Sequence, residues 1–178
     1  MLTALLSYFG SHQVGLVHSL CAVLALLVGW RVLAKPKGGN SHKLWGYSYV
    51  VLMLALNISA LFIHNLFVFG PFHIAALFSL VTVCIGVATA LLHTPYALRL
   101  HFECMSWSYV GLMAAFFSEG ITRLPWLASG AAFMGSVILM SLITCVIGGI
   151  TIHLRRPKWQ KLTTAYRKEF IGTPHKSI

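Results

Sequence analysis

The chain has 178 residues, of which 58% are hydrophobic and 9% are charged, and its formal net charge is +10. A soluble domain carries about a quarter charged residues, so this composition excludes an ordinary soluble protein and indicates a membrane protein. The basic excess could suggest a nucleic-acid-binding protein, but the sequence contains no motif of such a module. We therefore expect the lipid bilayer, and no nucleic acid, as a partner.

Five apolar stretches are long enough to cross a membrane as helices, which takes about 20 mainly apolar residues. They cover roughly residues 13–33, 44–66, 73–93, 102–119 and 126–152. The loops between them are short, so consecutive helices should be antiparallel neighbours. We predict an all-α polytopic membrane protein, in which residues 1–153 form a bundle of five transmembrane helices and residues 154–178 form a basic cytoplasmic tail. The apolar residues 1–9 either extend the first helix or lie in the membrane interface.

The distribution of Lys and Arg predicts the orientation of the bundle. The loop after the first span carries four of them, the loop after the third span carries one and the tail carries seven, so 12 of the 13 lie on one side. Because cytoplasmic loops are enriched in Lys and Arg, the N-terminus should lie outside and the C-terminus in the cytoplasm. The expected location is the inner (cytoplasmic) membrane of a bacterium, with the tail on anionic headgroups.

Small and polar residues inside the spans are expected to join helices to one another. Glycine lets two helices approach closely, and Ser or Asn can bond across the interface. Asn57 and Ser59 fit the second role. The glycines that fit the first are Gly86, Gly111, Gly130, Gly135, Gly148 and Gly149.

Nine histidines are the main chemical signal, and most of them lie near the ends of the predicted spans. Ionisable groups at membrane depth are costly and by default mark function or a pairing partner. The topology gives an inner cluster of His42, His93 and His101 and an outer cluster of His18, His64 and His73. Helical rotation turns His73 and His93 to different faces. We therefore expect His42 with His101 inside, and His73 with His18 or His64 outside.

Imidazoles from facing helices can hold b-type haem by axial ligation of the iron. A divalent metal is the other candidate, because neutral imidazole suits zinc, copper and iron. Its ligands would be His42, His101, His18 and His73. Carboxylate support is thin, since only Glu103 and Glu119 lie near the spans. No HExxH, GxSxG or phosphate-loop motif occurs, so whether the chain is an enzyme stays open.

Three stretches also resemble a known family. They read VHSLCAVLALLVGWRVL, KGGNSHKLWGYSYVVLM and LRLHFECMSWSYVGLMAAFFSEGITRLP, within roughly residues 15–125. They resemble the bacterial membrane proteins called domain of unknown function 2306. The matching positions are His18, His42, Gly46, Tyr47, His101, Met105, Ser108, Tyr109 and Arg123. The chain departs from the family's pattern at Lys43, Cys104 and Trp107, which stand in place of arginine, tryptophan and arginine.

The arrangement is also similar to cytochrome b561-type proteins, in which four helices hold two haems, although this likeness is one of architecture alone. The hypothesis we favour is a protein that binds haem b through histidines of facing helices for transmembrane electron transfer, with a quinone or a redox protein as partner. One alternative is a non-catalytic membrane subunit or scaffold with interfacial histidines. Another is a metal-binding or transport protein, although no inverted repeat is apparent. The oligomeric state is not indicated.

Overall fold

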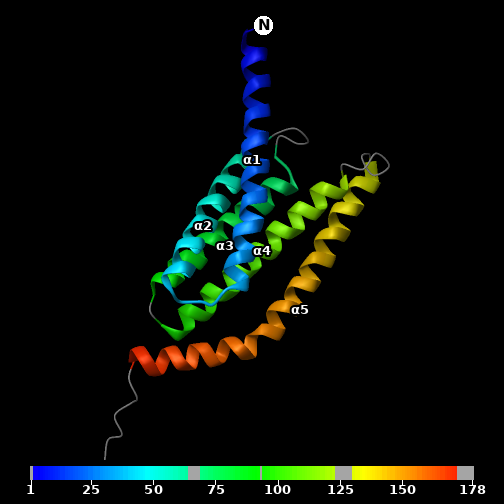
Figure 1. Cartoon of the computed structure of the whole chain (residues 1–178). Coiled ribbons are helices and arrows are strands. Elements are labelled where there is room, and N and C mark those ends of the chain that lie inside the picture. The colour runs from blue at the N-terminus through cyan, green and yellow to red at the C-terminus, as the bar shows by residue number, and fades with distance from the viewer. Residues whose placement is uncertain (1, 64–68, 93, 123–129, 172–178) are drawn as a thin grey trace, which may run out of the picture. The chain divides into compact units, whose positions relative to one another are not determined.

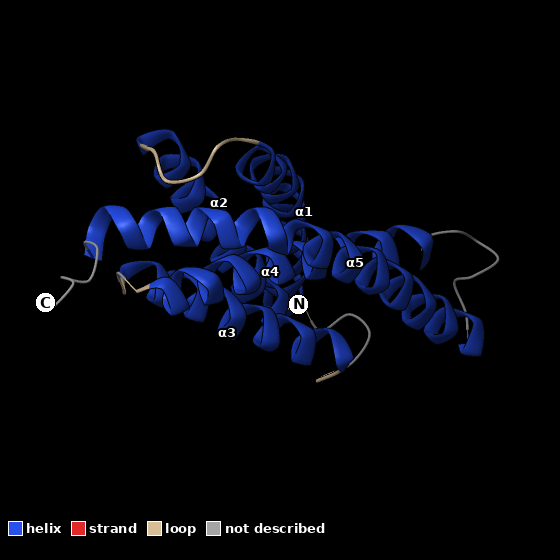
Figure 2. Cartoon of the chain, turned by 90° about the horizontal axis from the view of Figure 1, so that it is seen from below, coloured by secondary structure: helices blue, strands red, loops and turns tan. Residues whose placement is uncertain are grey.

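A computed structural model of the chain describes residues 2–63, 69–92, 94–122 and 130–171. Every regular element in these ranges is an α-helix, and no strand occurs among them (Figures 1 and 2). The helices are α1 (Leu2–Ala34), α2 (Asn40–Leu61), α3 (Pro71–Leu91), α4 (Pro95–Thr122) and α5 (Gly130–Ile171). The all-α membrane fold predicted from the sequence is confirmed.

The chain divides into two compact units, Met1–Val83 and Cys84–Ile178. The first unit contains α1, α2 and the N-terminal part of α3, and within it α1 packs along α2. The second unit contains the rest of α3 with α4 and α5, and within it α4 packs along α5. Each unit therefore has one main helix pair.

Among the described residues, four helical segments have the length and apolar composition to cross a membrane. They are Gln13–Ala34, Asn40–Leu61, Pro71–Leu91 and Phe133–Arg155. The expected span over residues 102–119 is helical throughout as part of α4. However, α4 is not one of the four, because it carries Arg99, Glu103 and Glu119 together with several serines.

Several helix ends follow from local residue preferences. Pro71 and Pro95 are the first residues of α3 and α4, a position where proline's missing N–H costs nothing. Gly38, between α1 and α2, has a φ of +90°, which glycine adopts readily because it has no Cβ. At its N-terminus α1 begins at Leu2, so residues 2–9 extend the first helix rather than forming a separate interfacial segment.

The last helix continues past the predicted membrane exit. α5 runs from Gly130 to Ile171 and so includes most of the basic segment after residue 153. Figure 1 shows α5 bending in its C-terminal half, where Pro157 lies. A proline inside a helix lacks the N–H that would bond the preceding turn, and it commonly bends the helix. The basic segment is thus a helical continuation of the last span as far as Ile171.

Small side chains bring α4 and α5 into close contact. A Cβ on Gly148 would lie 2.5 Å from a methyl carbon of Val110, and one on Gly149 would lie 3.3 Å from the Trp107 ring. Farther along, Ser118 Oγ lies 3.1 Å from Ser141 Oγ and donates to the Val137 carbonyl at 3.3 Å. The expectation that Gly148 and Gly149 permit close helix approach is confirmed.

Candidate histidine sites

His18 joins the first two helices. It lies on α1, half-buried, and its Nδ1 atom is 3.2 Å from the Leu56 carbonyl oxygen and 3.1 Å from Ser59 Oγ, both on α2. The prediction that Ser59 bonds across a helix interface is thereby confirmed. Asn57, by contrast, donates to the Met53 carbonyl of its own helix at 2.8 Å.

The neighbours of His18 determine which ring nitrogen carries the proton. A carbonyl oxygen can only accept, and Ser59 Oγ donates its one proton to the Leu56 carbonyl at 2.9 Å. Both neighbours of His18 Nδ1 are therefore acceptors, so Nδ1 must be the protonated nitrogen. In a neutral ring, Nε2 then carries the lone pair, and no hydrogen bond to it is found in the described part of the chain.

His101, in the second unit, is the same tautomer as His18, with the proton on Nδ1. Its Nδ1 lies 2.7 Å from the Gly86 carbonyl oxygen of α3, so Nδ1 donates and Nε2 again carries the lone pair. The same carbonyl accepts from Thr89 Oγ1 at 3.0 Å, and that hydroxyl is also 2.8 Å from the Ile85 carbonyl. The ring of His101 is thus held by α3.

Gly86 lies at a close contact between α3 and α4. A Cβ at Gly86 would lie 2.7 Å from Met105 Sδ and 3.3 Å from Cys104 Cβ, both in the turn that follows His101. A larger residue would require the Met105 side chain to move and Cys104 to shift by a few tenths of an ångström. Sequence spacing indicated Gly86 as a contact between helices but did not connect it with His101.

His73 is the opposite tautomer, with the proton on Nε2. Its Nδ1 accepts a hydrogen bond from the Gly70 backbone N–H at 3.2 Å, and its ring stacks on Phe69 with centroids 5.3 Å apart. The residue is 5% exposed. Because Nδ1 uses its lone pair to accept, the proton of the neutral ring lies on Nε2. Neither nitrogen of that tautomer offers a lone pair to a metal ion while this bond is kept.

The remaining predicted ligands are described only in part. His42 lies in the first turn of α2, half-buried, with its Nδ1 atom buried. His64 and His93 lie outside the described residues. His42 and His101 belong to different units, so their pairing stays a prediction. Within residues 2–63, 69–92, 94–122 and 130–171, no group of three or more His, Cys, Asp or Glu is arranged to hold a metal ion.

Comparison with known proteins places this chain in a family. No curated protein and no solved structure matches it. Residues 15–154 match the family described as "Predicted membrane protein (DUF2306)", and this range includes both His18 and His101. Since the match covers most of the sequence, including all or part of every helix from α1 to α5, the chain belongs to this family of predicted membrane proteins.

Proposed function

We propose that this membrane protein binds b-type haem, which His18 would hold at an outer site and His101 at an inner site, each through Nε2. The proposal is supported chiefly by one shared feature, which is that each of the two rings donates from Nδ1 to a main-chain carbonyl. Histidines that ligate metals almost always donate their other ring N–H in this way, which fixes the tautomer and the orientation of the ring. The sequence-based partner of His101 is His42, which would supply the second ligand of an inner site.

Bound haem would supply one-electron redox chemistry at iron. The residues of the chain would hold the two rings in place and provide an apolar, water-poor surrounding. Ser59 and the Leu56 carbonyl would orient His18, and the Gly86 carbonyl would orient His101. Haem in a membrane-spanning helical bundle is best suited to electron transfer. We therefore propose electron transfer across the bacterial inner membrane, with a quinone or a redox protein as partner.

The scaffold alternative gains support at one residue. His73 bonds the backbone at the start of its own helix, which is a structural role, so we exclude it from the ligand set. A divalent-metal site is favoured less than haem, because the described residues bring no three metal-binding side chains together. Haem needs only one or two ligands from the protein.

An absorption spectrum of the purified protein tests the proposal. After expression with ample haem, the wild-type protein should be red and should show a reduced-minus-oxidised spectrum of b type. His18→Ala and His101→Ala should each lose a spectral component. Haem binding should also weaken as the pH falls through the range in which free imidazole is protonated, around 6.5, since protonated imidazole has no lone pair.

The matched control is His73→Gln, whose side-chain oxygen can still accept from the Gly70 N–H. This variant should keep the full spectrum. A colourless wild-type protein would overturn the haem proposal. A spectrum lost in His73→Gln and kept in His18→Ala and His101→Ala would overturn the assignment of ligands.

A further inference from the structure

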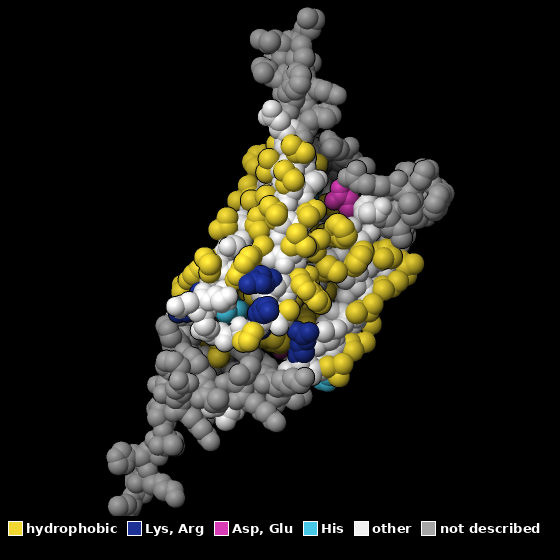
Figure 3. Space-filling view, in the orientation of Figure 1, with side chains coloured by type: hydrophobic (Ala, Val, Ile, Leu, Met, Phe, Trp, Pro, Cys, Tyr) yellow, Lys and Arg dark blue, Asp and Glu magenta, His cyan; other side chains and the backbone are white. Residues whose placement is uncertain are grey.

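The first unit has an unbalanced charge that gathers in one place. Residues 1–83 contain no Asp and no Glu, and the three acidic residues of the chain are Glu103, Glu119 and Glu169. The Lys and Arg of this unit are Arg31, Lys35, Lys37 and Lys43. All four lie where α1 ends and α2 begins, and we name residues 30–47 the basic turn. Figure 3 shows dark blue side chains at this end of α1, next to the yellow apolar surface.

One of the four cations, Lys37, donates hydrogen bonds to the backbone of the basic turn. Lys37 Nζ donates to the carbonyls of Leu33 and Lys35, both at 2.9 Å, and to that of Val32. These carbonyls belong to the end of α1, where the helix leaves its last acceptors without intrahelical partners. Lys37 therefore caps α1, and its ammonium group is committed to the backbone.

Arg31 is positioned differently. Its guanidinium lies 4.4 Å from the centre of the Trp45 ring, so α1 and α2 are joined by a cation–π contact. Arg31 is exposed, so its guanidinium can still donate to an anion while it lies over the ring. Lys35 and Lys43 are exposed, and the described residues make no hydrogen bond to the side chains of Arg31, Lys35 or Lys43. Three cations of the basic turn are thus exposed.

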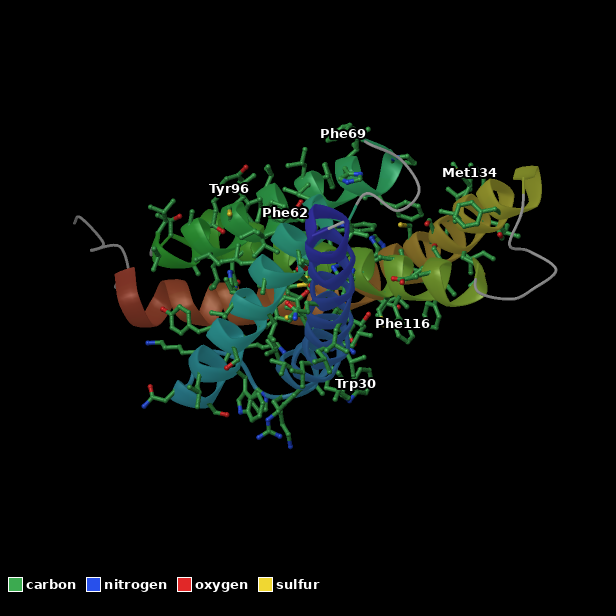
Figure 4. The ribbon with its side chains drawn as sticks, turned by 90° about the horizontal axis from the view of Figure 1, so that it is seen from above. Trp30, Phe62, Phe69, Tyr96, Phe116 and Met134 are labelled. Atoms are coloured by element: carbon green, nitrogen blue, oxygen red, sulfur yellow. The ribbon has the colours of Figure 1, made fainter. Side chains whose placement is uncertain are left out.

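Large apolar side chains are exposed beside these cations. Trp30 is 67% exposed, Leu44 67% and Tyr47 60%, and Figure 4 shows Trp30 pointing away from α1. The adjoining helices have the composition of membrane spans, ending at Ala34 and beginning at Asn40. Trp and Tyr gather where headgroups meet acyl chains, and anionic lipids attract Lys and Arg at that depth. The basic turn therefore presents both an apolar and a cationic surface at the edge of the bilayer.

We propose that the basic turn is a binding site for an anionic phospholipid. The phosphodiester is held by Arg31, with Lys35 and Lys43, and the acyl chains lie against the exposed apolar side chains nearby. A guanidinium fork matches the geometry of phosphate oxygens, and Trp45 fixes that fork in place. This inference does not depend on haem, because no histidine takes part in the contact.

Lipid retention by the full chain tests the proposal. The protein is placed in nanodiscs of phosphatidylcholine with a minor fraction of phosphatidylglycerol, and the lipids that stay bound are counted by native mass spectrometry. Wild type should retain phosphatidylglycerol preferentially. Arg31→Gln and Lys43→Gln should each lower this preference about fivefold, the equivalent of the ~1 kcal/mol that one basic residue contributes near an anionic surface.

The matched control is Lys37→Gln, which removes an equal charge from the same turn. Because Lys37 is committed to the end of α1, its replacement should leave the lipid preference near that of wild type. The basic residues after position 153 are unchanged in all variants, so differences between variants report on the basic turn alone. Circular dichroism verifies that each variant is folded.

Two further variants test the role of Trp45. Trp45→Phe keeps an aromatic face for Arg31 and should keep the preference, whereas Trp45→Leu should lower it. If Lys37→Gln and Arg31→Gln lowered the preference for phosphatidylglycerol equally, the attraction would be unspecific and the proposed site would be overturned. The site would also be overturned if Arg31→Gln and Lys43→Gln left the preference unchanged. Inorganic phosphate is tested separately with the protein in nanodiscs of phosphatidylcholine alone. If phosphate bound there and Arg31→Gln abolished this binding, the assignment to a lipid would be overturned.

Discussion

At the scale of single residues, His73 shows how a histidine can serve the backbone. Gly70 precedes the first residue of α3, and His73 is the third residue of that helix. Its Nδ1 accepts from the Gly70 N–H, while its own N–H donates to the Gly70 carbonyl at 3.0 Å. This reciprocal pair matches half of a capping box, in which Glu or Gln at the third helical position reaches back to the residue before the helix.

The capping role of His73 leads to a prediction about protein stability that does not depend on haem. His73→Ala should lower the free energy of unfolding by about 1 kcal/mol, the usual cost of losing a helix cap. His73→Gln should keep most of the stability, because Gln is a natural residue for this position. Unfolding by titration with a denaturing detergent, followed by circular dichroism, gives both values. Equal destabilisation by the two changes would contradict a capping role.

The sequence indicated on which helices the histidines lie but not which ring nitrogen is bonded. The structure places His18 on α1 and His101 on α4, and their depth in the membrane stays a prediction. Their partners, however, are the carbonyls of Leu56 and Gly86, and any residue type carries a carbonyl. The distinction between His73 and the other two histidines therefore depends on backbone geometry, which residue spacing does not reveal.

At the scale of helices, the contact between α4 and α5 leads to a second prediction. Gly148→Ala adds a Cβ that meets Val110 at 2.5 Å, so the helices must separate or Val110 must shift. Overpacking of this kind typically costs about 1–3 kcal/mol. The unfolding midpoint in detergent should fall accordingly. The double variant Val110→Ala, Gly148→Ala should recover part of the loss, because the smaller side chain makes room for the new methyl group.

Gly135 provides the matched control on the same helix. A Cβ there would have no neighbour within 4 Å. Gly135→Ala should be neutral or stabilising by up to about 1 kcal/mol, since alanine is the better helix former. A loss for Gly135→Ala as large as that for Gly148→Ala would show that the packing between Gly148 and Val110 is not the cause.

Sequence reasoning located the helices better than their contacts. The prolines at positions 71 and 95 begin α3 and α4, as their preference for a first helical turn implies. In contrast, Gly86 and Gly148 lie at tight contacts, whereas Gly111 and Gly135 face open space, and composition does not separate these two classes. The extent of α5 was also missed, because the basic residues after position 153 signal an exit from the membrane and not the end of a helix.

At the scale of the whole molecule, the orientation in the membrane stays a prediction that a reporter can test. With 12 of the 13 Lys and Arg on one side, a reporter fused after Ile178 should be active only in the cytoplasm. A reporter inserted between residues 64 and 68 should be active only outside. The reverse pattern would contradict the expected orientation and would exchange the inner and outer labels of His101 and His18.

The absence of Asp and Glu from residues 1–83 has a consequence for how the cations of this half of the chain are neutralised. Lys and Arg keep their positive charge at neutral pH. Within residues 1–83 no acidic side chain is present to pair with them. The counter-charge for the basic turn therefore has to come from outside this part of the chain.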